Sequence, residues 1–264
     1  MVKPGADPNS GSLSTRLPLI FGVSGHRDLR VADVPQLRAQ LSQVFARFRA
    51  AYPHTPFQLL TPLAEGADRL AADVALELEI DLLVPLPMKQ REYEQDFATA
   101  GSLADFRSLL GRAKAHWEIP MTTGAGAEDR TRQYAEVGEL IVRHSHVLIL
   151  FWDGKDNRKV GGTAWVKKRR ERWVKMASAT SSPREPMTCG PTIQVVTSRS
   201  SSRSPHVRPA TIGELPPAAA EYAAKLSRPS AKKQKPLPSY QSAFWAMNSF
   251  NAAASDLSAL KEPQ

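Results

Sequence analysis

Four short turns in the first two thirds of the chain carry residue types that bind phosphates and riboses. They span residues 22–28 (GVSGHRD), 65–68 (EGAD), 152–154 (WDG) and 161–163 (GGT). Glycine lets a backbone approach a ligand closely, and the bare N–H groups at the start of a helix attract anions. Because the carboxyl ends of parallel strands meet at one edge of a sheet, turns that follow strands should lie close together. The sequence therefore predicts one pocket for a phosphate-bearing ligand.

The side chains of these turns suggest individual roles. Arg27 offers a two-pronged hydrogen-bond donor for phosphate, and Glu65 could accept hydrogen bonds from ribose hydroxyls or act as a general acid. Asp68 would interact well with the dipole of a following helix with or without a ligand. Tyr134 could stack on a base or belong to the core. The candidate ligand-binding residues are Gly22, Ser24, Gly25, His26, Arg27, Glu65, Gly66, Asp68, Asp153, Gly154, Gly161, Gly162 and Thr163, with Glu65 the candidate catalytic residue.

Apolar runs of strand length alternate with segments of helical periodicity along most of the chain. The expected strands are 17–23, 57–62, 81–86, a short one within 113–120, 146–152 and 191–197. The expected helices are one between Asp33 and Pro53, then 67–78, 90–97, 103–115, 128–144 and 164–176. Such alternation is typical of an α/β protein, and we predict a Rossmann-like, doubly wound parallel sheet with helices on both faces.

Composition limits the class of protein. No apolar run is long enough to span a bilayer, and residues 1–15 lack the pattern of a signal peptide, so a cytoplasmic protein is expected. A single cysteine, Cys189, excludes a disulfide framework, and the six histidines do not have metal-ligand spacing. We expect no metal and no cofactor. The predicted organisation is a disordered N-terminus (1–15), a nucleotide-binding domain (16–197), and a basic Ser/Pro-rich linker with short helices (198–264).

The positive charge is concentrated in the second part of the chain. Residues 1–154 carry 16 Lys and Arg against 19 Asp and Glu, whereas residues 155–235 carry 18 against 5. Within the latter, Trp165 and Trp173 are interspersed with basic residues of one expected helix, namely Lys167, Lys168, Arg169, Arg170 and Arg172. Such a surface could bind nucleic acid through backbone phosphates, or could be a solvated basic tail.

The ordered set of motifs resembles the SLOG superfamily. The motifs are GVSGHRD at 22–28, PLAEGADRL at 62–70, VPLPMxxxEY at 84–93, and FWDG at 151–154 followed by GGTA at 161–164. The superfamily includes the Lonely Guy nucleoside-monophosphate phosphoribohydrolases and the DNA-processing recombination mediator proteins. The resemblance covers roughly residues 17–172, and it implies a Rossmann-like fold that binds nucleotides or nucleotide-derived ligands, in enzymes or in stress- or phage-defence sensors. Relatives often form dimers.

One departure from the family pattern bears on catalysis. In Lonely Guy enzymes a catalytic glutamate follows the glycine-threonine motif, and many relatives with the GGTA form have a glutamate directly after it. This chain has Trp165 there and no carboxylate before Glu171, and an indole cannot polarise a glycosidic bond as a carboxylate can. The resemblance therefore favours ligand binding by a sensor or signalling module. Cleavage of nucleoside monophosphates and nucleic-acid binding remain as alternatives.

Overall fold

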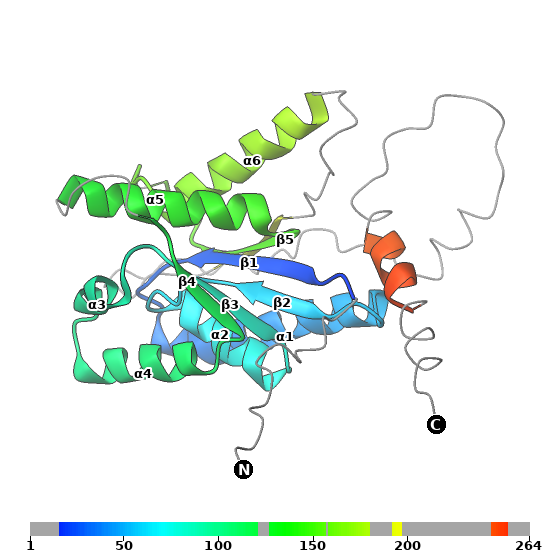
Figure 1. Cartoon of the computed structure of the whole chain (residues 1–264), viewed down its shortest axis with the longest axis horizontal. Helices are drawn as coiled ribbons and strands as arrows, with labels where there is room; N and C mark the ends of the chain where they lie inside the picture. Colours follow the sequence, from blue (N-terminus) through cyan, green and yellow to red (C-terminus); the bar gives the residue numbers. More distant parts are fainter. Residues whose placement is uncertain (1–15, 121–126, 157, 180–191, 197–243, 253–264) are drawn as a thin grey trace, which may run out of the picture.

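The computed structural model describes residues 16–120, 127–156, 158–179, 192–196 and 244–252 (Figure 1). Its centre is a six-stranded parallel sheet in the order β4-β3-β2-β1-β5-β6. The strands are β1 (Leu19–Gly25), β2 (Phe57–Leu60), β3 (Asp81–Leu86), β4 (Ala115–Glu118), β5 (Val147–Trp152) and β6 (Thr192–Val196). The chain proceeds from β1 to β4 in one direction and then returns to the other side of β1. This doubly wound topology confirms the predicted fold class.

Helices cover both faces of the sheet. Figure 1 shows α1, α2 and α4 below the strands and α5 and α6 above them, as right-handed crossovers require when the direction of winding reverses. The helices are α1 (Val34–Ala51), α2 (Ala67–Glu77), α3 (Gln90–Tyr93), α4 (Ala100–Gly111), α5 (Ala127–His144) and α6 (Thr163–Ala179). Two 3₁₀ turns, η1 (Val31–Asp33) and η2 (Glu94–Asp96), precede α1 and follow α3. No helix among the described residues is both long and apolar enough to cross a membrane.

The main core lies between the sheet and α1. The ring of Phe21 on β1 meets Phe45, Phe48 and Phe57 edge to face, at centroid distances of 5.1, 5.2 and 5.1 Å. These four rings are buried, and the edge-to-face arrangement is the favoured geometry of aromatic pairs. The helical spacing of Phe45 and Phe48 thus places α1 directly beneath β1.

Pro85 lies within β3, where a missing N–H would normally break the ladder. The β2–β3 register ends at Leu60 opposite Leu83, whereas β4 continues alongside β3 to Leu86. Pro85 therefore has no β2 neighbour that would need its N–H. The sequence predicts a strand over 81–86, which ends one residue after this proline, and β3 does end at Leu86.

The side chain of Arg170 joins α6 to α5. Although it lies in the basic cluster identified in the sequence, it is 1% exposed. Its guanidinium donates hydrogen bonds to the carbonyls of Val142, Ser145 and His146 at 2.8, 2.9 and 2.9 Å. Arg170 therefore satisfies carbonyl groups at the C-terminal end of α5, which a helix leaves without intrahelical partners, and it belongs to the core.

A helical segment at residues 244–252 packs at the amino ends of the strands. The buried Asn251 pairs with the backbone of Leu17, accepting from its N–H at 2.7 Å and donating to its carbonyl at 2.9 Å. Phe244 is also buried, against Tyr52 and His146. This segment lies within the region 198–264, where the sequence predicts short helices, one of them over 241–260. Residues 1–15, and the other short helix predicted there, over 214–226, lie outside the described residues.

We expect Arg170→Ala to lower the free energy of unfolding by about 2–4 kcal/mol, because three charge-assisted hydrogen bonds to buried carbonyls are lost. Urea unfolding followed by circular dichroism measures the change. Arg172→Ala removes an exposed arginine from the same helix and should change the value by less than about 0.5 kcal/mol. Equal effects of the two substitutions would contradict the structural role of Arg170.

Candidate functional site

A cavity of about 590 Å³ opens where the winding of the sheet reverses, at the carboxyl ends of the neighbouring strands β1 and β5. Ligands of open α/β sheets bind at such a switch point, and the volume is in the usual range of small-molecule sites. Eight of the predicted site residues line it. They are Ser24, Gly25, His26, Arg27, Asp68, Gly161, Gly162 and Thr163.

The turn after β1 is held by close backbone contacts. A Cβ atom on Gly25 would lie 2.3 Å from the Cβ of Ala67 and 2.7 Å from that of Phe151, so only glycine allows β1, β5 and α2 to meet here. The buried His26 accepts a hydrogen bond at Nε2 from the backbone N–H of Asp153, at 3.1 Å, and Nε2 lies 3.2 Å from Asp153 Oδ1. The imidazole therefore bridges the ends of β1 and β5.

The glycine before α2 serves packing. Gly66 has φ +78°, and a Cβ atom there would lie 2.3 and 2.4 Å from the carbonyl oxygens of Arg27 and His26. The N–H of Ala67 donates to the His26 carbonyl at 3.0 Å. The first turn of α2 therefore faces the β1 turn, and Gly66 is not among the residues that line the cavity.

Asp68, in the first turn of α2, forms part of the cavity wall and is 5% exposed. Burial raises its pKa to about 7, although the N–H of Ala64, which donates to Oδ2 at 3.3 Å, and the charge of Arg27 oppose the shift. Near neutral pH the carboxyl group is thus shared between its protonated and ionised forms. It can donate or accept a hydrogen bond at the cavity.

Two tyrosines that are not among the thirteen candidate site residues also line the cavity. Tyr93 at the end of α3 is fully buried, and its hydroxyl has no hydrogen-bond partner among the residues that the structure describes. Tyr134 on α5 donates to Asp96, which also pairs with Arg130. Burial, followed by the hydrogen bond to Asp96, raises the pKa of Tyr134 to about 12. The guanidinium carbon of Arg27 lies 5.1 Å from the centre of the Tyr134 ring, so Arg27 and the two tyrosines form one group.

Tyr93 had a sequence signal, because it ends the motif VPLPMxxxEY, but that motif was assigned no role in the site. Tyr134 was weighed between base stacking and the core, and it both lines the cavity and packs against the main core. Asp96 and Arg130, which also line the cavity, had no signal in their local sequence.

The start of α6 forms the opposite wall. Gly161 has φ +74° and passes close to the backbone of Tyr134 and Ala135. The N–H of Gly162 donates to the Lys159 carbonyl at 3.1 Å, so the first helical N–H groups available to a ligand are those from Thr163 onward. Trp165 does not line the cavity. It packs against Gly138 of α5, with the Arg169 guanidinium 4.9 Å from its ring, and Val166 lines the cavity in its place.

Five predicted site residues do not line this cavity, namely Gly22, Glu65, Gly66, Asp153 and Gly154. A Cβ on Gly22 would meet Ser145 and Ile141 of the α5 side, and Asp153 contacts His26 as described. Glu65 accepts a hydrogen bond from the Ser102 hydroxyl at the start of α4. Its role as an acid stays a prediction, which its place beside Ser102 does not support.

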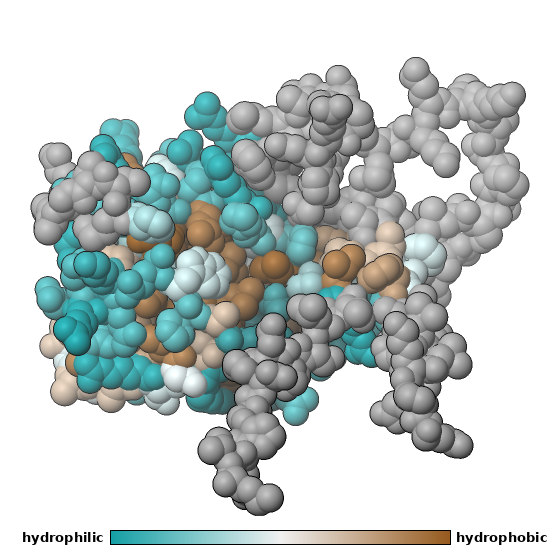
Figure 2. Space-filling view, in the orientation of Figure 1, coloured by the Kyte–Doolittle hydropathy of each residue, from teal (hydrophilic) through white to brown (hydrophobic). Residues whose placement is uncertain are grey.

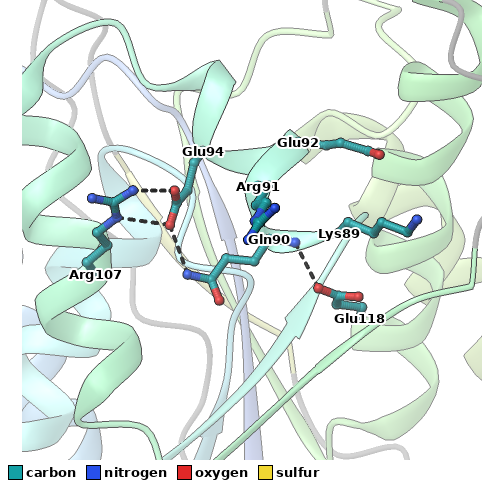
Figure 3. A pocket seen from close by; sticks show the side chains of 7 residues that line it. All are labelled: Lys89, Gln90, Arg91, Glu92, Glu94, Arg107 and Glu118. Atoms are coloured by element: carbon teal, nitrogen blue, oxygen red, sulfur yellow. Dashed lines mark hydrogen bonds and ion pairs between the residues drawn. The ribbon is translucent and has the colours of Figure 1, made fainter.

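A second hollow, of about 740 Å³, lies beside α3 and is lined by charged side chains (Figure 3). Arg107 holds Glu94 with two hydrogen bonds of 3.0 and 2.6 Å, and the side-chain amide of Gln90 adds a third at 2.8 Å. The backbone N–H of Gln90 donates to Glu118 at 2.9 Å. Because these polar groups form hydrogen bonds with one another, the hollow offers fewer hydrogen-bonding groups to a ligand than the switch-point cavity does. Among the described residues, no group of three or more His, Cys, Asp or Glu could hold a metal ion.

No protein-family profile and no curated protein matches the chain. Two solved structures of DNA processing protein A resemble it distantly, each at 13% identity. The Streptococcus pneumoniae protein aligns with a TM-score of 0.41 over 59% of this chain and 47% of its own, so this chain spans about half its length. The Helicobacter pylori protein, described for its single-stranded DNA binding mode, aligns with a TM-score of 0.39 over 65% and 69%. Likeness at this level carries no argument about ligands.

The raised pKa of Asp68 predicts a pH-dependent cost of burial. Because its pKa in the folded state lies above the unfolded value of 3.8, its contribution to stability is complete at low pH and is lost as pH rises through 7. Asp68→Asn should therefore gain stability relative to the parent protein between pH 4 and pH 8, by about 3 kcal/mol. Urea unfolding at a series of pH values measures this difference. Asp105→Asn, at an exposed carboxylate of α4, reports the effect of a lost surface charge. A constant difference for Asp68→Asn would contradict the raised pKa.

Proposed function

We propose that the switch-point cavity binds a nucleotide or nucleotide-derived ligand, as a sensor or signalling module would. The observation that carries this proposal is that one cavity combines the N-terminal end of α6, the Arg27 guanidinium and the Tyr93 hydroxyl, which has no partner in the described part of the chain. The first two suit a phosphate, and the third is a buried polar group whose partner a ligand would supply.

The phosphate would lie at the start of α6. This helix is 17 residues long, and the N-terminus of a helix attracts anions through its dipole and its unpaired N–H groups. Arg27 and the exposed Lys159 line the same cavity and add positive charge. Thr163 adds a hydroxyl at the first helical position.

The nucleoside would lie toward α2 and α3. A base can stack on an aromatic ring such as that of Tyr134, and a ribose or base can exchange hydrogen bonds with the Tyr93 hydroxyl and the Asp68 carboxyl. Asp68 suits either a donor or an acceptor, because its pKa of about 7 leaves both forms populated. A buried hydroxyl without a partner destabilises the protein alone, and a ligand would relieve that cost.

The alternative of N-glycosidic cleavage requires a carboxyl group at the reacting atoms. Neither Glu65 nor position 165 lines the cavity, and the carboxyl groups that do are Asp28, Asp68 and Asp96. Of these, Asp96 is engaged by Tyr134 and Arg130. Binding therefore remains the better supported function.

Nucleic-acid binding through the basic helix is less well supported. Arg170 is buried, and Lys167, Lys168 and Arg169 pair with Glu171, Asp156 and Glu139 respectively. Their charges are therefore already partly neutralised. The other basic residues of the second half lie mostly outside the described residues, and the partner assignment there stays a prediction.

The proposal predicts that a panel of adenine nucleotides and their cyclic derivatives contains at least one that raises the melting temperature of the full chain by mass action. Arg27→Gln should abolish this shift, because the phosphate loses its charged donor. Arg132→Gln serves as the matched control, since Arg132 is exposed on α5 and does not line the cavity.

The absence of a shift with every nucleotide would overturn the proposal. Chromatography of the same mixtures detects free base, which would assign the site to cleavage instead. Binding of single-stranded DNA that survives Arg27→Gln and weakens steeply with salt would assign the function to the basic surface.

Tyr93→Phe should separate stability from binding. Removal of a buried hydroxyl that has no partner is expected to raise the free energy of unfolding by about 1 kcal/mol, whereas the affinity for the stabilising nucleotide should fall by about tenfold. Urea unfolding without ligand and calorimetric titration with ligand measure the two effects. A variant that is less stable and binds normally would show that the hydroxyl serves the fold and not the ligand.

A further inference from the structure

The motif PLAEGADRL at 62–70 contains an arginine that the structure buries. Arg69 of α2 is 8% exposed, although hydrophilic side chains cover most of the surface around α3 and α4, at the left of Figure 2. Burial lowers the pKa of its guanidinium, and Nη2 has no hydrogen-bond partner among the described residues. A buried charge with an unsatisfied donor is costly, so Arg69 lowers the stability of the fold unless its other contacts compensate.

These contacts join three segments next to the switch-point cavity. Nε of Arg69 donates to the carbonyl of Leu63, after β2, at 3.2 Å. Nη1 donates to the carbonyl and the hydroxyl of Ser102, in the first turn of α4, at 2.7 and 2.9 Å, and that hydroxyl in turn donates to Glu65. The ring of Phe97, directly after η2, has its centre 4.5 Å from the guanidinium carbon. Arg69 itself does not line the cavity.

Leu63 has a backbone conformation that leucine rarely adopts. Its φ is +58° and its side chain is fully buried, and a bulky residue in the left-handed region is strained. Hydrogen bonds hold it there, because its N–H donates to the Thr61 hydroxyl at 3.3 Å and its carbonyl accepts from Arg69. Pro62 and Ala64, on either side, line the cavity. The strain therefore lies in a turn that forms part of the cavity wall.

The peptide group between Leu63 and Ala64 is held at both ends by consecutive residues of α2. Its carbonyl accepts from Nε of Arg69, and its N–H donates to Oδ2 of Asp68 at 3.3 Å. A trans peptide is planar, so its C=O and N–H point in opposite directions, and none of the described peptide bonds is cis. Arg69 thus fixes the plane of a peptide group whose other side holds the Asp68 carboxyl at the cavity.

We propose that Arg69 is a positioning residue of the switch-point cavity, which fixes the Asp68 carboxyl through the Leu63–Ala64 peptide group without touching a ligand. The proposal rests on the proposed function in one respect, namely that Asp68 contacts the nucleotide. It also gives a role to residues that do not line the cavity, because Glu65 binds the Ser102 hydroxyl that holds Arg69.

Arg69→Lys removes the hydrogen bond to Leu63 alone. Lysine has a carbon atom where arginine has Nε, so it cannot donate to the Leu63 carbonyl from there, whereas its ammonium keeps the charge and a donor for Ser102. The measurement is the pH titration of the Ala64 amide signal in the full chain, labelled with ¹⁵N-alanine and free of ligand. An amide that donates to a carboxylate shifts when the carboxylate gains a proton, so this signal reports on Asp68. Ala64→Ser identifies it.

In the parent protein the Ala64 signal should titrate with a midpoint near 7, the pKa to which burial raises Asp68, and Asp68→Asn should abolish the titration. Arg69→Lys should reduce its amplitude to less than about half, because the N–H no longer points at Oδ2. A parent signal that does not titrate, or a full amplitude in Arg69→Lys, would overturn the proposal.

Arg49→Lys is the matched control. Arg49 also donates to a backbone carbonyl, that of Leu78 at 3.0 Å, and also lies over a phenylalanine ring, that of Phe57 at 5.5 Å, but it does not line the cavity. This variant should leave the Ala64 titration unchanged. A loss of amplitude here as large as in Arg69→Lys would contradict a specific role of Arg69. Circular dichroism establishes that each variant is folded.

A second measurement uses the adenine nucleotide that gives the largest shift of melting temperature in the panel above. Arg69→Lys should raise its dissociation constant by about tenfold, but by less than about twofold in the Asp68→Asn background, because Arg69 acts only through Asp68. Equal effects in the two backgrounds would overturn the proposal. If no nucleotide of the panel binds, the proposed function fails, whereas the titration of Ala64 still decides whether Arg69 positions Asp68.

Discussion

The close approach of β1, β5 and α2 at Gly25 is the constraint on which the site depends. Because no side chain separates Gly25 from Phe151 and Ala67, the turn after β1 lies directly against the start of α2. Gly66 allows the same contact from the other side, where its φ of +78° brings the backbone against the carbonyls of His26 and Arg27. Arg27 and Asp68 are thereby held on neighbouring walls of one cavity. The glycines that looked like ligand contacts in the sequence serve largely to bring these side chains together.

The fold could be predicted from the sequence because each element carries its own local signal. The apolar run of β5, for example, is buried along almost its whole length, and Phe45 and Phe48 recur at the spacing of one face of α1. The turns after β1 and before α6 were also found, since glycine at strand ends and helix starts reports on backbone geometry. These signals are local, and the parallel order of the strands then limits how the turns can meet.

The remaining part of the site depends on contacts between distant segments. Four residues of the site come together only where α5 crosses above the end of α3, namely Tyr93, Asp96, Arg130 and Tyr134. Arg170 is a second example of a residue whose place depends on distant contacts. In the sequence it is one of five basic residues on an expected helix, but in the structure it is buried at the end of α5. A local pattern shows which residues share a helix face, but not which face the neighbouring helix covers.

The contact between Phe244 and His146 gives the fold an internal reporter. The imidazole accepts the Ile20 N–H at Nδ1, and burial, together with the charge of Arg170, lowers its pKa to about 4. Phe244 contributes to that burial, with its ring centre 6.0 Å from the imidazole. If the segment 244–252 were lost, water would reach the imidazole and its pKa would move back toward 6.5. The pKa of His146, at the amino ends of the strands, therefore reports whether the segment 244–252 is packed against the sheet.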